Sequence, residues 1–296
     1  MKILVTGANG QVGQELQFLA TNFTDFDIVF TDSSTLDITN EAAVIALFET
    51  HQFDYCLNCA AYTAVDKAES NQELAFQVNV VGTENLAKAC AKHKTWLVHL
   101  STDYVYHTNI NRPYIETDET APKCVYAATK LEGSQKALVI NPLTTIIRTS
   151  WVYSSFRHNF VKTMLRLSES RTTLSVVFDQ IGTPTYARDL ALAMLKIVEQ
   201  INASPKNASQ IGIFHYSNEG VTSWYDFAHA VYEITQTTMV LLPIESKDYP
   251  TPAKRPHFSV LNKAKIKNTF NLTIPHWRTA LLQCIITLQH ENKTIQ

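Results

Sequence analysis

Short apolar runs alternate with longer amphipathic stretches through the first half of the chain. The first run, residues 2–6, contains Ile, Leu and Val and ends at a glycine, which is typical of a strand buried on both faces. Similar runs predict strands over 27–31, 54–60, 96–100 and 144–148, and the stretches between them predict helices over 14–20, 41–49 and 71–93. This alternation indicates an α/β fold, a Rossmann-type doubly wound parallel sheet covered by helices on both faces.

The pattern changes after residue 150. Helices are expected over 159–167, 189–200 and 224–234, with a strand over 213–216. We therefore predict two parts, a first domain over residues 1–150 and a smaller, mostly helical lobe formed mainly by residues 151–296. The chain is expected to return to the first sheet over about residues 174–212.

Composition excludes several classes of protein. Of the 296 residues 45% are apolar and the formal net charge is −2, so the chain has the balance of a globular protein and no basic tract for nucleic acid. No apolar run approaches the roughly 20 residues that span a bilayer. The apolar residues before the first glycine are too few for a signal peptide, so we expect a cytoplasmic protein.

Cysteine and histidine spacings predict no metal centre. Cys56 and Cys59 form a C-x-x-C pair, but they lie in an expected buried strand and no second ligand pair follows. Small buried apolar side chains are therefore favoured over a redox or zinc site. His99, His158 and His257 are scattered along the chain, and we assign them no chemistry.

A glycine-rich turn follows the first strand directly. Gly7, Gly10 and Gly13 form a G-x-x-G-x-x-G pattern that opens a helix. Glycines allow a tight turn and close backbone approach, and a helix N-terminus presents free N–H groups to a pyrophosphate. We therefore expect this turn, including Gln11 and Val12, to bind NADH or NADPH, which makes the first domain the cofactor domain. A purely structural turn is the alternative.

Other candidate cofactor contacts follow the expected strands. Asp32 lies about 20 residues after the last glycine, where an acidic group binds the adenosine ribose, although it could simply cap its own loop. No Lys or Arg stands between Lys2 and Lys67, so a 2′-phosphate lacks a local basic partner, which favours NADH or tolerance of both cofactors. Small residues at a strand end let a flat cofactor lie against the backbone. The remaining candidates are Asp37, Ile38, Ala60, Ala61, Tyr62 and Thr63.

Tyr126 and Lys130 are a candidate proton-transfer pair. They are four residues apart in an expected helix, so both side chains leave the same face. An ammonium beside a phenol lowers the phenol's pKa, which would allow proton transfer near neutral pH. Thr102 follows another expected strand and directs a hydroxyl to the same cleft. The alternative is a buried aromatic residue beside a solvated lysine, because this spacing is common by accident.

These motifs occur together with further blocks over 60–69, 101–106, 148–153, 179–185, 224–227 and 249–256. As a set they resemble the extended short-chain dehydrogenase/reductases, and most closely the dTDP-4-dehydrorhamnose reductase family. The resemblance extends to about residue 280, and its later blocks separate this family from sugar-nucleotide epimerases and dehydratases. Cys124, Ala127 and the bulky loop 154–158 depart from the usual pattern, which bears on the shape of the substrate mouth.

The resemblance implies NAD(P)H-dependent reduction of dTDP-4-dehydro-β-L-rhamnose to dTDP-β-L-rhamnose, the last step in making this sugar donor for lipopolysaccharide and other cell-surface polysaccharides. Tyr126 would donate a proton, Lys130 would hold the nicotinamide ribose and lower the phenol's pKa, and Thr102 would position both. The implied substrate contacts are Thr102, Asp103, Trp151, Lys254 and Arg255. The last two could neutralise the diphosphate, and a solvated basic loop is the alternative.

Some relatives use magnesium held by acidic residues at a dimer contact, so Mg²⁺ and a homodimer are further expectations. Glu15 is the one candidate ligand identified. Two alternatives to the reductase stay open. One is a sugar-nucleotide epimerase or dehydratase that recycles bound NAD⁺, and Asp103 without a following Glu argues against the dehydratase. The other is a non-catalytic subunit like the regulatory partner of methionine adenosyltransferase, against which the intact Thr102, Tyr126 and Lys130 weigh.

Overall fold

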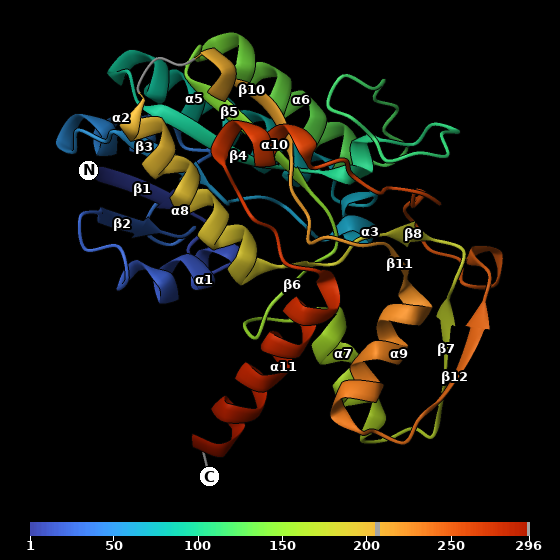
Figure 1. The fold of residues 1–296 in the computed structure, drawn as a ribbon. Helices are drawn as coiled ribbons and strands as arrows, with labels where there is room; N and C mark the ends of the chain where they lie inside the picture. Colours follow the sequence, from blue (N-terminus) through green and yellow to red (C-terminus); the bar gives the residue numbers. More distant parts are fainter. Residues whose placement is uncertain (205–207, 295–296) are drawn as a thin grey trace.

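A six-stranded parallel sheet organises the molecule (Figure 1). The computed structural model describes residues 1–204 and 208–294. In spatial order the strands are β10 (Gly212–His215), β5 (Thr144–Thr149), β4 (Trp96–Thr102), β3 (Tyr55–Asn58), β1 (Lys2–Thr6) and β2 (Asp27–Thr31). The strand order reverses at β1, since β2 lies on one side of it and β3 on the other. In open α/β sheets a ligand crevice forms at such a switch point, beyond the carboxyl ends of the strands.

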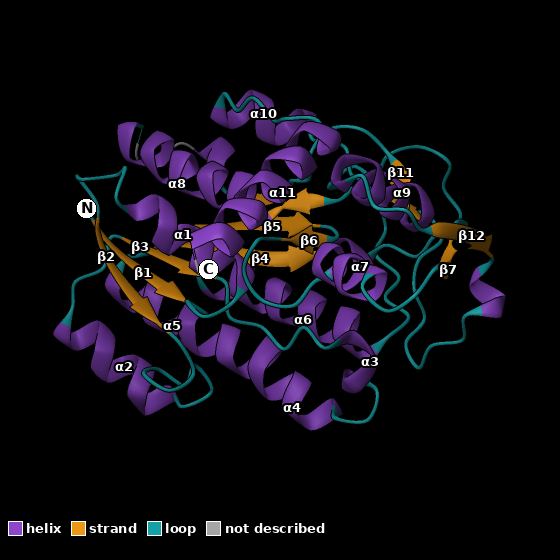
Figure 2. Ribbon diagram, turned by 90° about the horizontal axis from the view of Figure 1, so that it is seen from below, coloured by secondary structure: helices purple, strands orange, loops and turns teal. Residues whose placement is uncertain are grey.

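Helices cover both faces of this sheet (Figure 2). On one face lie α1 (Gln11–Ala20), α8 (Ala187–Ala203) and α10 (Ala264–Phe270), and on the other lie α2 (Glu41–Thr50), α5 (Gly82–His93) and α6 (Val125–Ile140). Two apolar clusters fill the layers between helices and sheet, one with α1 and α8 and one with α2 and α5. Parallel strands buried on both faces explain the continuous apolar runs of the sequence, and the predicted fold class is confirmed.

A smaller lobe packs beyond the carboxyl edge of the sheet. It contains α7 (Phe160–Ser168), α9 (Trp224–Thr235) and α11 (Trp277–Thr294), with their own aromatic core. Its strand pairs are β7 (Thr173–Val177) with β12 (Val240–Ile244), β6 (Val152–Tyr153) with β9 (Thr185–Tyr186), and β8 (Ile181–Gly182) with β11 (Thr222–Ser223). The short helices α3 (Val65–Ala68) and α4 (Gln72–Phe76) complete the fold.

Two segments differ from the sequence-based picture. The stretch expected to return to the first sheet begins with β7, which pairs with β12 outside that sheet, whereas α8 packs on α1 and β10 joins the sheet beside β5. The single helix expected over 71–93 is α4 and α5 joined by a π-helical turn, Gln77–Val81. None of the described helices is long and apolar enough to cross a membrane.

Candidate active site

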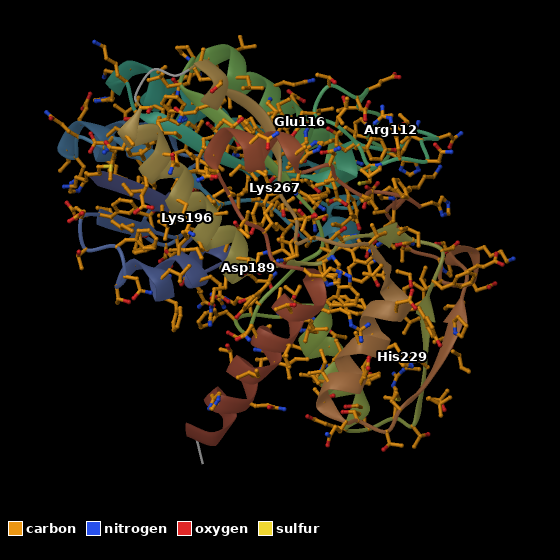
Figure 3. The ribbon with its side chains drawn as sticks, viewed as in Figure 1. Arg112, Glu116, Asp189, Lys196, His229 and Lys267 are labelled. Atoms are coloured by element: carbon orange, nitrogen blue, oxygen red, sulfur yellow. The ribbon has the colours of Figure 1, made fainter. Side chains whose placement is uncertain are left out.

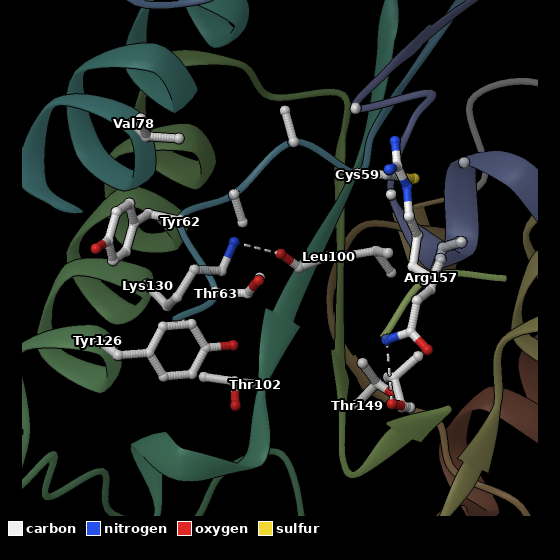
Figure 4. A pocket seen from close by; sticks show the side chains of 18 of the residues that line it. Cys59, Tyr62, Thr63, Val78, Leu100, Thr102, Tyr126, Lys130, Thr149 and Arg157 are labelled. Carbon is white, nitrogen blue, oxygen red and sulfur yellow. Dashed lines mark hydrogen bonds between the residues drawn. The ribbon is translucent and has the colours of Figure 1, made fainter. Parts of the chain in front are cut away.

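One cavity of roughly 960 Å³ opens beyond the carboxyl ends of β1, β3, β4 and β5 (Figure 4). It brings together every predicted site residue except Lys254 and Arg255. The predicted residues that line it are Gly7, Gly10, Gln11, Val12, Gly13, Asp32, Asp37, Ile38, Ala60, Ala61, Tyr62, Thr63, Thr102, Asp103, Tyr126, Lys130 and Trp151. Residues that follow different strands meet here because parallel strands present their carboxyl ends at one edge.

The glycine turn is packed too tightly for side chains. Gly7 has φ +71°, and a Cβ there would lie 2.6 Å from the Ala60 nitrogen. A Cβ on Gly13 would lie 2.3 Å from the Gly7 carbonyl oxygen. Helix α1 begins directly after Gly10, so its free N–H groups face the cavity without a side-chain cap. Beside them the Gln11 Oε1 is buried and has no hydrogen-bond partner among the described residues.

At the far end of the cavity two carboxylates shape their own turns. Asp32 Oδ1 accepts hydrogen bonds from the Ser34 nitrogen at 2.9 Å and the Ser34 hydroxyl at 2.6 Å, and these bonds lower the pKa of Asp32. Asp37 Oδ1 accepts from the Thr39 nitrogen at 2.9 Å. Both residues still line the cavity. Each carboxylate therefore stabilises its own turn, and its contact with a cofactor stays a prediction.

Arg157 is a cavity residue that the sequence analysis missed. It lies between β6 and α7, and its Nε donates to the Asn9 carbonyl oxygen at 2.5 Å, against the glycine turn. It lines the same cavity as Asp32 (Figure 4). The expectation that a 2′-phosphate lacks a local basic partner considered only the residues between Lys2 and Lys67, and Arg157 lies outside that span. The bulky loop 154–158 thus brings a guanidinium to the glycine turn.

The segment after β3 is fixed by the π-helical turn. Asn79 of this turn accepts from the Tyr62 nitrogen at 2.8 Å and donates to the Tyr62 oxygen at 3.2 Å and the Thr129 hydroxyl at 3.0 Å. One side chain therefore joins the Ala60–Thr63 wall of the cavity to α6. π-Helical turns occur often at functional sites, where the extra residue redirects a side chain.

Tyr126 and Lys130 leave the same face of α6 but reach different groups on β4. Lys130 Nζ donates to the Leu100 oxygen at 2.7 Å, whereas the Tyr126 hydroxyl points toward Thr102 (Figure 4). Burial lowers the pKa of Lys130 to about 7. Burial raises the pKa of Tyr126, and a hydrogen bond with Thr102 opposes that rise. The expectation that Lys130 lowers the phenol's pKa is therefore wrong for this structure, because desolvation dominates and Nζ is directed at the backbone of β4.

Asp103 is a buried acid beside the phenol. It is 1% exposed, and its Oδ1 accepts from the Thr102 hydroxyl at 3.1 Å. Its Oδ2 makes no hydrogen bond of normal geometry with the described residues. Burial raises the pKa of Asp103 to about 7, and the interactions with the Ser259 and Thr102 side chains oppose that rise. A buried carboxylate oxygen without a partner is costly, so one that lines a cavity is a candidate ligand contact.

Two stacked indoles form another part of the cavity wall. Trp151 and Trp224 lie 3.7 Å apart at 9°, and both line the cavity. Trp151 has φ +46°, a left-handed conformation that is uncommon for a bulky residue and often marks a functional site. The sequence analysis identified Trp151 but used Trp224 only as a family motif. Their separation of more than 70 positions gave no signal that they would touch.

A family model described as the RmlD substrate binding domain matches residues 1–290. A dTDP-4-dehydrorhamnose reductase from Aggregatibacter actinomycetemcomitans is 40% identical over 286 residues, which cover 95% of this chain and 97% of that protein. The chain belongs to the dTDP-4-dehydrorhamnose reductase family. The reductase of Escherichia coli strain K12 is 39% identical and covers 95% of this chain and 96% of its own.

Solved structures agree with this assignment. A dTDP-4-dehydrorhamnose reductase from Clostridium acetobutylicum matches with a TM-score of 0.92 and 39% identity, covering 98% of this chain and 100% of that one. The Bacillus anthracis reductase, solved in complex with NADP, matches with a TM-score of 0.90 and 35% identity, covering 97% and 99%. The resemblance recognised in the sequence is confirmed.

Lys254 and Arg255 are the predicted site residues that lie apart from this cavity. Neither lines the cavity, and Lys254 is exposed. The Arg255 guanidinium is held by Asp66 through two bonds, of 3.0 and 2.6 Å, and by the Thr251 hydroxyl at 2.6 Å. Its charge is thus matched within the protein, and the bidentate pair fastens the loop 249–256 to α3.

The residues around Glu15 do not fit a magnesium ion. The buried Glu15 accepts from the Ser154 hydroxyl at 2.7 Å and from Arg188 Nε at 2.8 Å, so both carboxylate oxygens are engaged. Asp189, labelled at the start of α8 in Figure 3, accepts from Asn218 at 2.7 Å. No cluster of three or more His, Cys, Asp or Glu among the described residues is placed to hold a metal. An arginine occupies the position beside Glu15 that a cation would need.

Proposed function

We propose that this protein reduces the C4 ketone of dTDP-4-dehydro-β-L-rhamnose to give dTDP-β-L-rhamnose, with NADPH or NADH as reductant. The observation that carries the proposal is the meeting of a phosphate-binding glycine turn, a Tyr–Thr pair and a buried acid around one cavity. The relatives named above are dTDP-4-dehydrorhamnose reductases, and one of them binds NADP.

The cofactor fits the part of the cavity built on β1 and β3. The N-terminus of α1 and the Gln11 Oε1 supply polar groups for the pyrophosphate and its surroundings. Asp32 and Asp37 line the same cavity, and we assign them to the adenosine ribose and adenine. Arg157 adds a cation to this end, so we propose that it contacts a cofactor phosphate and that NADPH is used. When bound, the reduced nicotinamide supplies the hydride.

The chemical step needs a proton on the ketone oxygen as hydride reaches C4. Tyr126 donates that proton, because burial keeps its phenol protonated over the working pH range. Thr102 holds the phenol and the developing oxyanion in line. Lys130, anchored on Leu100, is placed to hold the nicotinamide ribose hydroxyls. No step requires a metal ion.

The substrate lies between the phenol and the two indoles. Asp103 lines this part of the cavity, where its carboxyl accepts a hydrogen bond from a sugar hydroxyl, and the Trp151 indole contacts the ring or base. The assignments of Asp103 and Trp151 are kept from the sequence analysis, while Trp224 is added and Lys254 and Arg255 are left out.

The test is oxidation of NADPH and of NADH, followed by loss of nicotinamide absorbance, with the 4-dehydro sugar generated in situ. One cofactor consumed per sugar reduced is expected, and Tyr126→Phe provides the matched control. Binding of cofactor without its consumption, together with change of the sugar, would indicate an epimerase or dehydratase that recycles NAD⁺. Binding without any change of the sugar would indicate a non-catalytic subunit.

A further inference from the structure

Buried polar side chains form a continuous series of contacts from Thr6 on β1, through Asn58 and His99, to Lys130. The Asn58 Oδ1 accepts from the Thr6 hydroxyl at 2.7 Å and from the Ala60 nitrogen at 3.1 Å. A backbone N–H can only donate, so the Ala60 contact fixes which end of the Asn58 amide is oxygen. The Asn58 Nδ2 must therefore donate to the His99 Nδ1, which lies 3.0 Å away.

This contact fixes the tautomer of His99. Burial and the nearby Lys130 hold the pKa of His99 well below its ordinary value, so the ring is neutral and carries one proton. Because Nδ1 accepts from Asn58, that proton is on Nε2. The Nε2 lies 3.3 Å from the Lys130 Nζ. His99 therefore presents an N–H, and not a lone pair, to the lysine.

The contact discriminates between the two forms of Lys130. An ammonium has three donors and no acceptor. A charged Lys130 therefore cannot form a hydrogen bond with the His99 N–H, because both groups are donors. A neutral amine has a lone pair that accepts from His99 while one of its own N–H groups donates to the Leu100 oxygen. The Cys59 thiol, in the segment after β3, also interacts with Lys130. This interaction raises the pKa of Lys130 and so opposes the loss of its charge.

We propose that His99, oriented by Asn58, is a positioning residue that weakens the hold of Lys130 on its proton by presenting an N–H, and not a lone pair, to Nζ. The effect on turnover rests on the proposed function, in which the charged Lys130 holds the nicotinamide ribose. Reductase activity then falls on the alkaline side as Lys130 loses its proton.

Two substitutions replace the donor that faces the Lys130 Nζ with an acceptor, and they do so by different routes. Asn58→Asp keeps an acceptor for Ala60 but turns a carboxylate oxygen to the His99 Nδ1, which moves the ring proton to Nδ1 and leaves Nε2 free to accept from Lys130. His99→Gln adds no charge and can turn a carbonyl oxygen to Nζ. Each is expected to raise the pKa of Lys130 by about one unit or more, a tenfold change in proton affinity.

The matched control is Ser134→Ala. The Ser134 hydroxyl donates to the Lys130 backbone oxygen at 2.7 Å, one turn along α6, and does not touch Nζ. This change disturbs the same helix without altering the His99 contact, so the Lys130 titration is expected to stay where it is.

The direct measurement is NMR titration of the protein carrying ¹³C-labelled lysine, with the Lys130 signal identified by its loss in Lys130→Met. A higher midpoint in Asn58→Asp and His99→Gln, but not in Ser134→Ala, supports the inference, and if one variant fails to fold the other decides. An unchanged midpoint in the folded variants overturns it, even if the enzyme is an active reductase. A shifted midpoint without any shift in the alkaline limb of turnover leaves the inference standing and refutes the proposed role of Lys130.

Discussion

Two glycines of the same turn are needed for different reasons, and substitution separates them. A Cβ on Gly13 meets three backbone atoms, the Gly7 oxygen at 2.3 Å, the Ala8 Cα at 2.6 Å and the Ala8 oxygen at 2.6 Å. A Cβ on Gly10 meets only the Gly7 oxygen, at 3.2 Å, and Gly10 has φ −77°. Gly13→Ala must displace α1 from β1. Gly10→Ala requires the Gly7 oxygen to move by only a few tenths of an ångström and places its methyl group at the glycine turn.

The magnitudes follow from these contacts. Backbone atoms cannot rotate away, so Gly13→Ala is expected to cost about 3 kcal/mol, the upper end of overpacking penalties. Proteins of about 150–250 residues lose about 2–4 °C per kcal/mol, and this chain of 296 residues lies beyond that range. We therefore use the lower figure, which gives a loss in Tm of about 6 °C. Gly10→Ala is expected to change Tm by less than about 2 °C, since it meets a single atom near contact distance. The Kd of the Gly10→Ala variant for NADPH should rise about tenfold or more, because the added methyl group keeps the pyrophosphate from approaching the backbone.

The assay is thermal unfolding of both variants alongside NADPH titration by fluorescence at a temperature where both are folded. The expected result is a Tm loss confined to Gly13→Ala and a binding loss with normal stability in Gly10→Ala. Equal stability of the two variants would falsify the packing argument. Unchanged NADPH affinity in Gly10→Ala would show that the turn is structural and binds no phosphate.

Further predictions concern single side chains. Tyr126→Phe should lower kcat about 10²- to 10⁴-fold while NADPH affinity is kept, which binding and turnover assays compare directly. Arg157→Ala should raise KM for NADPH about three- to tenfold through loss of a charge-assisted hydrogen bond, and a KM unchanged for both cofactors would contradict the assignment. Chelation by EDTA should leave turnover unchanged, because Arg188 already neutralises Glu15. Burial raises the pKa of Asp103 from 3.8 to about 7, so its ionisation lowers stability as pH rises through this range. Asp103→Asn should therefore raise Tm above neutral pH but not at acidic pH. Melting curves of the wild-type protein and the variant over a series of pH values test this.

The central part of the site could be predicted because it depends on local sequence and strand direction. Each apolar run of the first half gave a strand, and the polar residues after each run, such as Thr63 and Thr102, had to meet at one edge of the sheet. The glycine turn has a local signature for the same reason. No knowledge of side-chain contacts was needed to place these residues around one cavity.

Contacts between distant segments were not predictable in this way. Arg157 reaches Asn9 across 148 positions and Arg255 pairs with Asp66 across 189, so neither charge can be assigned from its neighbours in sequence. The sequence analysis did not single out Arg157, and it assigned Arg255 to the substrate without the Asp66 pairing in view. In each case the sequence shows a charge but not the group that balances it, and the partner decides whether the charge is free to bind a ligand.

The pKa shifts at Tyr126 and Lys130 have a consequence for the direction of catalysis. Spacing placed both side chains on one helix face but could not show that burial would raise the pKa of the phenol and lower that of the ammonium. An oxidising enzyme of this kind needs a phenolate as base, which a lower phenol pKa supplies. A reductase needs the phenol itself, and the alkoxide that forms at C4 is far more basic than a phenolate, so proton transfer from Tyr126 remains downhill. A raised phenol pKa is therefore compatible with reduction and unfavourable for the reverse oxidation at neutral pH.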